Sequence, residues 1–411
     1  MLKTDDKIIP FSVREVVEDT FNTLSINRRT NKQFIPRSNH LLLFCSELLG
    51  SKISIIKKFQ PEIEDLIVQI LTSFEKLSLW ENIGMFTGMG NLAFSIKSIQ
   101  NKTGQLTRLS SSLDQLLLDQ TLSYVKTHKN IYEPCNYDLI SGVSGILYYF
   151  LNNQNSIVST SSIQELVDYL NFILAGYELP NLKSQNISFK ILEKDNYCDI
   201  SLLLDMAHGI LSCLISLSKA NYLGYKLKKG LDVISNMLDI YSFFYEQEPN
   251  CLIFPIETSH LGTTHGKSIG IKKTFNSGWC CGSSGICYGL LKSFSYLSDR
   301  TATEFYRGKL VDILNQDINN HNFEYPILCH GYSSLLCLKD FYIQHGLQNS
   351  LSNVVSATTK SHIELLTKGN QNDRVQYLES NSILTGNLGV TLSLLSLWSS
   401  EFEFAKLLML D

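Results

Sequence analysis

The chain has 411 residues, 18% of them charged, which is enough for one large core or for two to three average domains. Its formal net charge of −4 gives no reason to expect nucleic acid or an anionic membrane as a partner, and the charged start, MLKTDDK, lacks the apolar run of a secretory signal. The 10 cysteines show no spacing typical of a disulfide scaffold, so we expect a cytosolic protein with reduced thiols.

A glycine followed by a mostly uncharged, apolar run recurs along the chain. In chain order the copies are Gly88 with 89–96, Gly142 with 146–151, Gly209 with 210–217, Gly282 with 286–296, Gly331 with 335–338 and Gly386 with 390–398. The copies at Gly142, Gly282 and Gly386 have the fuller form Gly-x-x-Gly-aliphatic. A degenerate first copy, without its glycine, is expected at residues 38–41.

An amphipathic segment with its charges on one face precedes each of these runs. The segments are 63–79, 113–127, 163–177, 231–244, 304–318 and 354–366. The chain therefore alternates a half-exposed helix, a turn and a buried helix, and about seven such pairs fit.

Alternating half-exposed and buried helices predict two layers, with the buried helices inside. We expect an all-α fold, an α/α-toroid or double-layered barrel, as a single domain over residues 1–411. Because each connection runs from an outer to an inner helix at the glycine, all inner helices should begin at the same end. The residues just before each glycine should then gather at one mouth of the barrel.

Two intervals and one uncharged stretch depart from the helical pattern. Residues 183–198 and 251–275 alternate like strands, so we expect an inserted strand-containing subdomain over 178–205 and 248–278. Residues 380–400 carry no charge but hold too many polar residues for a membrane span. They are interpreted as a helix buried on all sides.

Side chains able to do chemistry lie just before four of the glycines. They are Asp138 (four residues before), His208 (one), Cys280 (two), Cys329 (two) and His330 (one). Cys280, Cys329 and His330 suit zinc, because two thiolates and an imidazole with a fourth position open are typical of a catalytic zinc site. His208 is an acid–base candidate, since the unperturbed pKa of histidine lies near 6.5. Asp138 could cap the following helix or orient His208 or a substrate group.

Other cysteines and histidines are assigned plainer roles. Cys281 is either a fourth ligand, which would make the zinc structural, or a neighbour facing away; we favour the second because consecutive side chains diverge. A zinc set of His260, His265, Cys280 and Cys281 is conceivable but lacks a usual finger spacing. Four cysteines in apolar runs are interpreted as core, and five histidines as surface or structural: Cys45, Cys213, Cys287 and Cys337, and His40, His128, His321, His345 and His362.

Four segments resemble the lanthipeptide synthetase C family, the lanthionine-forming cyclases of bacterial lantibiotic biosynthesis. They are residues 137–146 (YDLISGVSGI), 207–209 (AHG), 278–282 (GWCCG) and 329–333 (CHGYS). The resemblance implies an α/α-toroid of seven helix pairs with one zinc ion on Cys280, Cys329 and His330, and catalytic roles for His208 and Asp138. It implies intramolecular Michael addition of precursor-peptide cysteines to dehydroalanine or dehydrobutyrine, which forms thioether rings.

The same resemblance implies partners and a place in the cell. A dehydrated precursor peptide with its leader would be the substrate. A complex with a lantibiotic dehydratase and an ABC transporter would associate the cytoplasmic chain with the membrane. The sequence departs from the family pattern at Cys281, where tyrosine is usual, at Asn276, where many members carry arginine, and at Asn91, where a glycine is common.

Two other functions fit parts of the pattern. A protein prenyltransferase-like enzyme is also an α/α-barrel whose zinc activates a peptide thiol, but its zinc set includes an aspartate. A non-catalytic scaffold that binds thiols or peptides around a structural zinc would follow if Cys281 were the fourth ligand. A barrel glycosidase is disfavoured, because no paired carboxylates stand out at the glycine turns.

Overall fold

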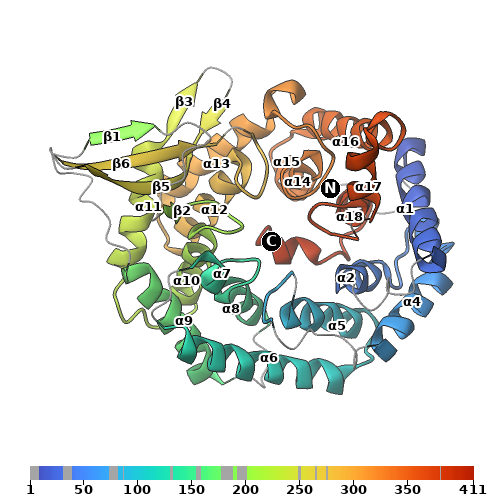
Figure 1. The fold of residues 1–411 in the computed structure, drawn as a ribbon, viewed down its shortest axis with the longest axis horizontal. Coiled ribbons are helices and arrows are strands. Elements are labelled where there is room, and N and C mark those ends of the chain that lie inside the picture. Colours follow the sequence, from blue (N-terminus) through green and yellow to red (C-terminus); the bar gives the residue numbers. More distant parts are fainter. Residues whose placement is uncertain are drawn as a thin grey trace. The chain divides into compact units, whose positions relative to one another are not determined.

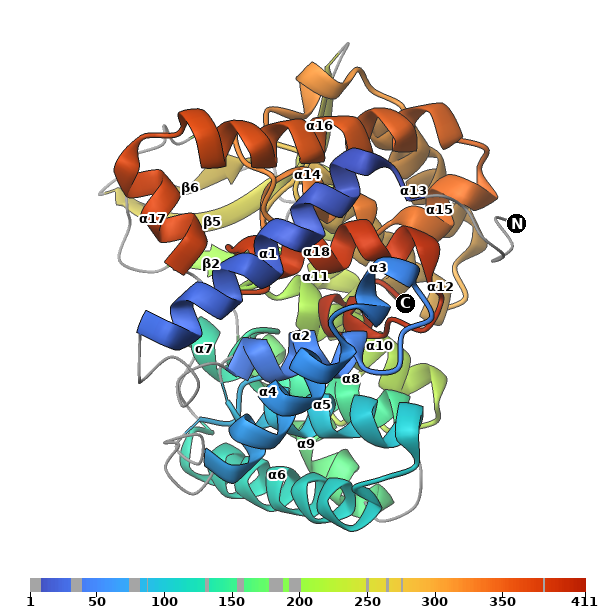
Figure 2. The same ribbon diagram turned by 90° about the vertical axis from the view of Figure 1, so that its right-hand side faces the viewer.

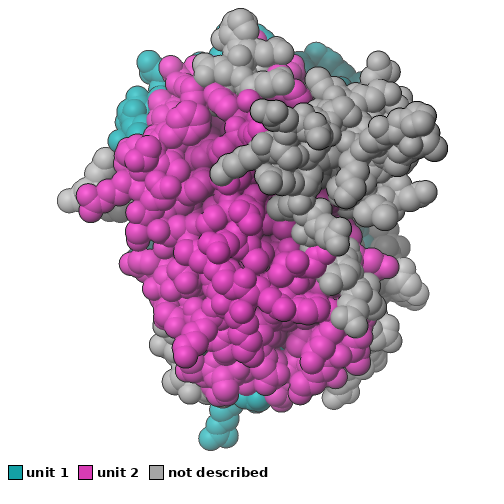
Figure 3. Space-filling model, turned by 90° about the vertical axis from the view of Figure 1, so that its left-hand side faces the viewer, with its two compact units in different colours: residues 1–117, 317–319, 323–411 teal, residues 118–316, 320–322 magenta. Residues whose placement is uncertain are grey.

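The computed structural model describes residues 9–30, 39–73, 82–86, 88–129, 133–153, 159–176, 188–191, 201–248, 251–263, 266–274, 276–379 and 381–411. The chain divides into two compact units (Figure 3). Unit 1 comprises residues 1–117, 317–319 and 323–411, and unit 2 comprises residues 118–316 and 320–322. The single domain expected over residues 1–411 stays a prediction.

Unit 1 contains the first and the last helices of the chain (Figure 1). They are α1 Phe11–Thr30, α2 Asn39–Leu48, α3 Ser54–Lys57, α4 Gln60–Ser73, α5 Met89–Thr103, α14 Tyr332–Leu336, α15 Lys339–Gln344, α16 Gln348–Lys368, α17 Gln371–Glu379 and α18 Asn387–Leu395. Helix α6, Thr107–Thr127, begins in unit 1 and ends in unit 2. The outer helices α1 and α16 lie against each other (Figure 2).

Helix α18 explains the uncharged stretch near the end of the chain. All of its residues are buried, and it packs against α1, α2 and α14 within unit 1. A charge anywhere on this helix would lose its hydration without gaining a partner, which is why the stretch is uncharged. The interpretation of a buried helix is thus confirmed for residues 387–395, whereas residues 381–386 form the turn before it and residue 380 lies outside the described residues. Among the described residues, no helix is both long and apolar enough to cross a membrane.

Unit 2 contains three buried helices and three amphipathic ones. The buried helices α8 Val143–Asn152, α10 Leu211–Tyr222 and α12 Ser283–Tyr296 lie side by side (Figure 1). The amphipathic helices are α9 Thr160–Gly176, α11 Asp232–Phe244 and α13 Arg300–Leu314. A short helix, α7 Pro134–Tyr137, precedes α8. Buried serines join α8 and α10: the Ser144 hydroxyl donates to Ser212 at 2.9 Å, and the Ser216 hydroxyl donates to the Ser144 carbonyl at 3.0 Å.

The predicted alternation agrees with the helices of the described residues. In chain order they form seven pairs: α1 with α2, α4 with α5, α6 with α8, α9 with α10, α11 with α12, α13 with α14, and α16 with α18. The amphipathic α1 was not among the predicted segments. Several predicted boundaries were wrong by three residues or more: α13 ends at Leu314 rather than at residue 318, α16 begins at Gln348 rather than at residue 354, and α18 ends at Leu395 rather than at residue 398.

The two strand-like intervals pair with each other in unit 2. The strands are β1 Ser188–Ile191, β2 Ser201–Leu203, β3 Glu246–Glu248, β4 Cys251–Ile253, β5 Pro255–Thr263 and β6 Gly266–Lys273. One sheet has the order β1-β6-β5-β2, with β1 parallel to β6 and the other pairs antiparallel, and β3 and β4 form a separate antiparallel pair. The expected pairing of the two intervals is therefore confirmed, and β2 leads directly into the turn before Gly209.

Candidate active site

The buried helices begin at tight turns that fold back onto the first helical residues. A Cβ on Gly282 would lie 2.1 Å from the Gly278 nitrogen, and a Cβ on Gly142 would lie 2.4 Å from the Asp138 nitrogen. Both glycines have extended backbone, with φ of −100° and −97°, so close approach rather than φ demands glycine. The side chains just before each glycine are consequently held at the start of a buried helix.

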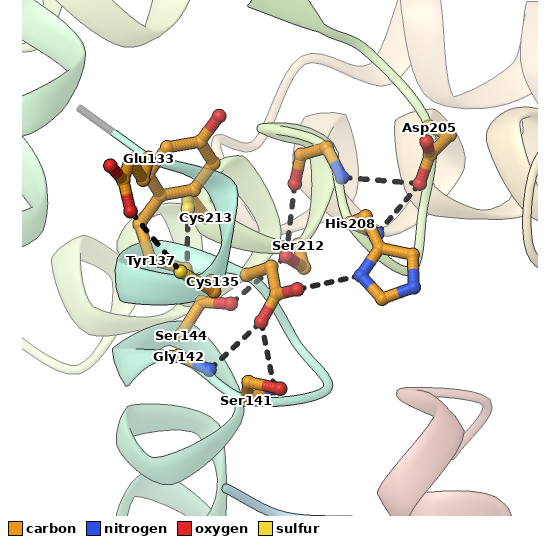
Figure 4. Close-up of polar contacts among 12 residues, drawn as sticks. Glu133, Cys135, Tyr137, Ser141, Gly142, Ser144, Asp205, His208, Ser212 and Cys213 are labelled. Atoms are coloured by element: carbon orange, nitrogen blue, oxygen red, sulfur yellow. Dashed lines mark hydrogen bonds and ion pairs between the residues drawn. The ribbon is translucent and has the colours of Figure 1, made fainter.

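Asp138 and His208 form a hydrogen-bonded pair in unit 2 (Figure 4). Asp138 Oδ2 lies 2.7 Å from His208 Nδ1; the Asp138 side chain is 1% exposed, whereas that of His208 is 51% exposed. A carboxylate accepts hydrogen bonds and does not donate them, so Nδ1 carries the proton in this pair. Proton exchange with a substrate then falls to Nε2.

The other oxygen of Asp138 holds its own turn. Oδ1 accepts the backbone N–H groups of Ser141 and Gly142 at 2.7 and 2.8 Å. Helix α8 begins at Val143 with Gly142 as its N-cap and has no side-chain cap, so Asp138 fixes the turn before the helix rather than capping the helix itself. Of the roles considered for Asp138, the structure shows the contact that orients His208.

Asp205 is a site residue that the sequence reasoning missed. Its Oδ1 accepts the backbone N–H of His208 at 2.7 Å and that of Gly209 at 3.1 Å (Figure 4). Burial raises the pKa of Asp205 to about 6, although its backbone hydrogen bonds oppose the shift. A signal was present: Asp205 lies four residues before Gly209, the same spacing as Asp138 before Gly142.

Backbone hydrogen bonds join the three glycine turns of unit 2. The Leu139 N–H donates to the Ala207 carbonyl at 3.2 Å, and the Met206 N–H donates to the Cys280 carbonyl at 2.9 Å. The turn that carries His208 therefore contacts the turn of Asp138 on one side and the turn of Cys280 on the other. Unit 2 thus brings together three of the five predicted site residues.

The glycine turns of unit 1 are joined in a similar way. The Cys329 N–H donates to the Leu384 carbonyl at 2.8 Å. The Ile383 N–H donates to His40 Nδ1 at 3.2 Å, and His40 Nε2 lies 2.5 Å from the Phe86 carbonyl oxygen. Burial lowers the pKa of His40, which favours the neutral ring that both bonds require. His40 lies in the degenerate first copy, and its side chain makes these contacts there.

The cysteines fall into two groups by burial. Cys280, Cys281 and Cys329 are half-buried and His330 is exposed. By contrast, the four cysteines predicted to be core are buried, and burial raises the pKa of each thiol; for Cys337 it does so to about 12. The core assignment is confirmed, and those four stay protonated at neutral pH.

The metal assignment depends on residues of both units. Cys280 belongs to unit 2, whereas Cys329 and His330 belong to unit 1. The predicted zinc site over these three residues therefore stays a prediction. Across the parts of the chain that the structure describes, no group of three or more His, Cys, Asp or Glu side chains is placed to hold a metal ion. The donor chemistry nevertheless fits zinc, whose protein ligands are thiolates and imidazoles. Of the other conceivable set, the side chain of His260 and all of His265 lie outside the described residues.

Asn276 is part of the Cys280 turn and stands where many members of the family that the chain resembles carry arginine. Its Oδ1 accepts the Gly278 N–H at 2.9 Å, and its carbonyl accepts the Ser283 N–H at 3.0 Å. The side chain therefore stabilises the turn that leads to Trp279, which is itself buried.

Comparison with known proteins agrees with this arrangement of motifs. The sequence model of the family described as "Lanthionine synthetase C-like protein" matches residues 42–409. The nisin biosynthesis protein NisC of Lactococcus lactis subsp. lactis is 24% identical over 307 residues, which cover 72% of this chain and 70% of NisC. A solved structure of nisin cyclase superposes with a TM-score of 0.61 at 17% identity, and the match covers 97% of this chain and 98% of that one.

These likenesses test two predictions made from the sequence. The structural match confirms the all-α fold of the α/α-toroid class. The family match spans most of the chain and includes every segment on which the resemblance was based. The chain therefore belongs to the lanthionine synthetase C-like family and is an enzyme of its cyclase type.

Proposed function

We propose that the chain closes lanthionine rings in a dehydrated precursor peptide by intramolecular Michael addition. The observation that carries the proposal is the Asp138–His208 hydrogen bond of 2.7 Å, on a turn that is bonded to the turn of Cys280. An imidazole with a fixed tautomer beside a thiol-bearing turn is an arrangement suited to proton transfer during thiol addition.

The chemistry requires two proton movements, and His208 can serve both. Addition of the substrate sulfur to the β-carbon forms the C–S bond, breaks the C=C π bond and leaves an enolate. Nε2 of His208 takes the proton of the thiol, and the same nitrogen returns a proton to the α-carbon. Asp138 keeps the proton on Nδ1 and stabilises the imidazolium between the two transfers. Atoms and charges then balance without an outside reagent.

The thiol and imidazole donors of the predicted set favour zinc as the cofactor. Cys280, Cys329 and His330 would hold one ion, and Cys281 would face away from it. When bound, the ion would lower the pKa of the substrate thiol and favour its nucleophilic form. The precursor leader, the complex with a dehydratase and an ABC transporter, and residence in the cytoplasm stay predictions.

The test is to mix the purified chain with a dehydrated precursor peptide and count free thiols by alkylation and mass spectrometry. We expect thiols to disappear without a change in peptide mass, because Michael addition is intramolecular. The Cys280→Ala variant should lose this activity by about 100-fold or more, since it removes a metal ligand. Cys135→Ser, which removes an exposed thiol outside the predicted set, is the matched control.

Two outcomes would overturn the proposal. Thiols that persist with the wild-type chain, or that disappear equally fast with Cys280→Ala, exclude the proposed reaction at this site. Metal analysis of the same preparations separates the roles of the neighbouring cysteines. If Cys281→Ala contains no zinc, as is expected for Cys280→Ala, Cys281 is a fourth ligand, the site is closed and the non-catalytic scaffold becomes the better interpretation.

A further inference from the structure

We propose that Asp205 is a positioning residue whose buried carboxylate fixes the backbone of His208 and thereby aligns the imidazole with Asp138 and with the Cys280 turn. This inference rests on the acid–base role proposed for His208. It concerns a residue that was not among the predicted site residues.

One oxygen atom of Asp205 holds the two residues that determine where the imidazole lies. Oδ1 accepts the N–H of His208 at 2.7 Å and the N–H of Gly209 at 3.1 Å. The side chain is 8% exposed, so water has little access to replace it as the acceptor. A buried N–H group that loses its acceptor carries the full cost of its lost hydration, so the turn would rearrange.

The rest of the turn is fixed by neighbouring elements. The Leu204 N–H donates to the Ile256 carbonyl at 2.8 Å, and the hydroxyl of Tyr241 donates to the Leu204 carbonyl at 2.6 Å. Met206 bonds to the Cys280 carbonyl, and the Ala207 carbonyl accepts from Leu139. These bonds fix the backbone of residues 204, 206 and 207. The Asp205 carboxylate fixes the backbone of His208 and Gly209, and His208 carries the imidazole.

The position of the imidazole depends on the backbone that carries it, because about half of the side chain is exposed. His208 is 51% exposed, and the 2.7 Å bond to Asp138 holds the ring from one side. A rotation of the His208 backbone would lengthen that bond or turn Nε2 away from the substrate. Misplacement of a catalytic group by about 1 Å can cost on the order of 100-fold in rate.

The ionisation of Asp205 supports a positioning role over a purely stabilising one. Burial raises its pKa from 3.8 to about 6, so its contribution to stability is complete below pH 3.8 and is lost as the pH rises through about 6. At neutral pH an uncharged amide would stabilise the fold better. The carboxylate gives shorter and stronger bonds to the two N–H groups, which favours precise placement of the turn.

The experiment compares Asp205→Ala with Asp205→Asn in the full chain. Asp205→Ala removes the acceptor, so kcat for thiol loss should fall about 10- to 100-fold while KM and zinc content stay near those of wild type. Asp205→Asn keeps an acceptor oxygen in the same place, although its bonds are weaker than those of the carboxylate, and should recover most of the kcat that Asp205→Ala loses. A structural role alone would move Tm without this split between kcat and KM.

The matched control is Glu47→Ala, because Glu47 is another buried carboxylate that holds backbone N–H groups. Glu47 Oε2 accepts from Glu403 at 2.7 Å and from Phe404 at 3.3 Å, all within unit 1. We expect this variant to lower Tm and to leave kcat unchanged at temperatures well below Tm. An equal fall in kcat for Glu47→Ala would overturn the inference, as would an unchanged kcat for Asp205→Ala. A loss with Asp205→Asn as deep as with Asp205→Ala would also overturn it.

The NMR signals of the His208 imidazole report its position independently of ring closure. The imidazole resonances of His208, assigned by their absence in His208→Ala, should shift in Asp205→Ala and return in Asp205→Asn. If the wild-type chain closes no rings but these shifts occur, the proposed function fails and the positioning role stands. If rings form but the resonances do not move in Asp205→Ala, the positioning role fails alone.

Discussion

At the scale of single residues, Asp138 satisfies three partners with two oxygen atoms. Oδ1 accepts two backbone N–H groups of its own turn, and Oδ2 contacts His208 Nδ1. The sharing couples the conformation of the turn before α8 to the tautomer of the imidazole. A substitution that spares one of these tasks can therefore fail at the other.

Asp138→Asn tests this coupling. The amide oxygen can still accept the N–H groups of Ser141 and Gly142, but the amide nitrogen then faces Nδ1 and favours the wrong tautomer of His208. We expect helical content and Tm near those of wild type, with the rate of thiol loss reduced on the order of 100- to 10,000-fold. Circular dichroism and the alkylation assay measure the two effects, and a wild-type rate would contradict the proposed role of Asp138.

At the scale of elements, the second glycine of the Gly-x-x-Gly form lets each turn approach the helix that follows. A Cβ on Gly285 would lie 1.8 Å from the Trp279 carbonyl oxygen, and a Cβ on Gly389 would lie 1.7 Å from the Ile383 carbonyl oxygen. These oxygen atoms belong to the backbone, which cannot move aside for a new Cβ as the end of a flexible side chain can. The glycine therefore specifies where the turn before α12 or α18 must lie.

Gly285→Ala should displace the turn that carries Trp279 and Cys280. We expect a loss of roughly 2 to 3 kcal/mol in the free energy of unfolding, as for an overpacked core, together with lost activity. The control is Gly308→Ala in α13, where a Cβ meets nothing within 4 Å. Alanine there should raise stability by about 0.5 to 1 kcal/mol. Urea titrations measure both changes, and equal effects at the two positions would refute the close-approach argument.

The same scale explains how far the sequence could predict the fold. The buried helices were predictable because an inner helix excludes charge, as in α18, whose residues are all buried, and in α8, whose residues are buried except Asn152. Helix α17 was not predicted, since its mostly polar residues give no apolar face to recognise. The pairing of β1 with β6 was predictable from alternation, but its parallel direction depends on contacts distant in sequence.

The candidate site was predictable to a similar extent. Spacing before a glycine placed Asp138 and His208 at equivalent turns, and the structure pairs them. The spacing of Asp205 before Gly209 was visible in the sequence, but its role was not, because its carboxylate binds backbone N–H groups, which leave no mark in the residue types around it. His40 was assigned no motif because its contacts, Phe86 and Ile383, lie far away in the chain.

At the scale of the whole molecule, a buried histidine links stability to pH. His362 is 1% exposed, its Nδ1 lies 2.7 Å from the Tyr377 hydroxyl, and its Nε2 lies 3.9 Å from Asp19. Burial lowers the pKa of His362 from 6.5 to about 4. Below pH 6.5 the unfolded chain binds a proton that the folded chain does not, so stability falls with pH until about pH 4.

The expected loss from this residue is about 3 kcal/mol between pH 7 and pH 4. Urea denaturation across this range measures it, and His362→Gln should reduce the dependence. Part of the pH dependence of the free energy of unfolding should remain in that variant, because burial also lowers the pKa of His40. A free energy of unfolding that is flat from pH 7 to pH 4 would show that neither ring is buried in the neutral form.

The backbone bonds between successive turns have a consequence for how such an enzyme can diverge. The contacts from Leu139 to Ala207 and from Met206 to Cys280 use main-chain atoms, so the reactive side chains of His208 and Cys280 can change while the turns keep their places, provided that the carboxylates of Asp138 and Asp205 remain. Evolution or an engineer can therefore change the reactive groups in unit 2 while keeping the scaffold. His40 is different, because its ring is itself a connector in unit 1, and that position has far less freedom to vary.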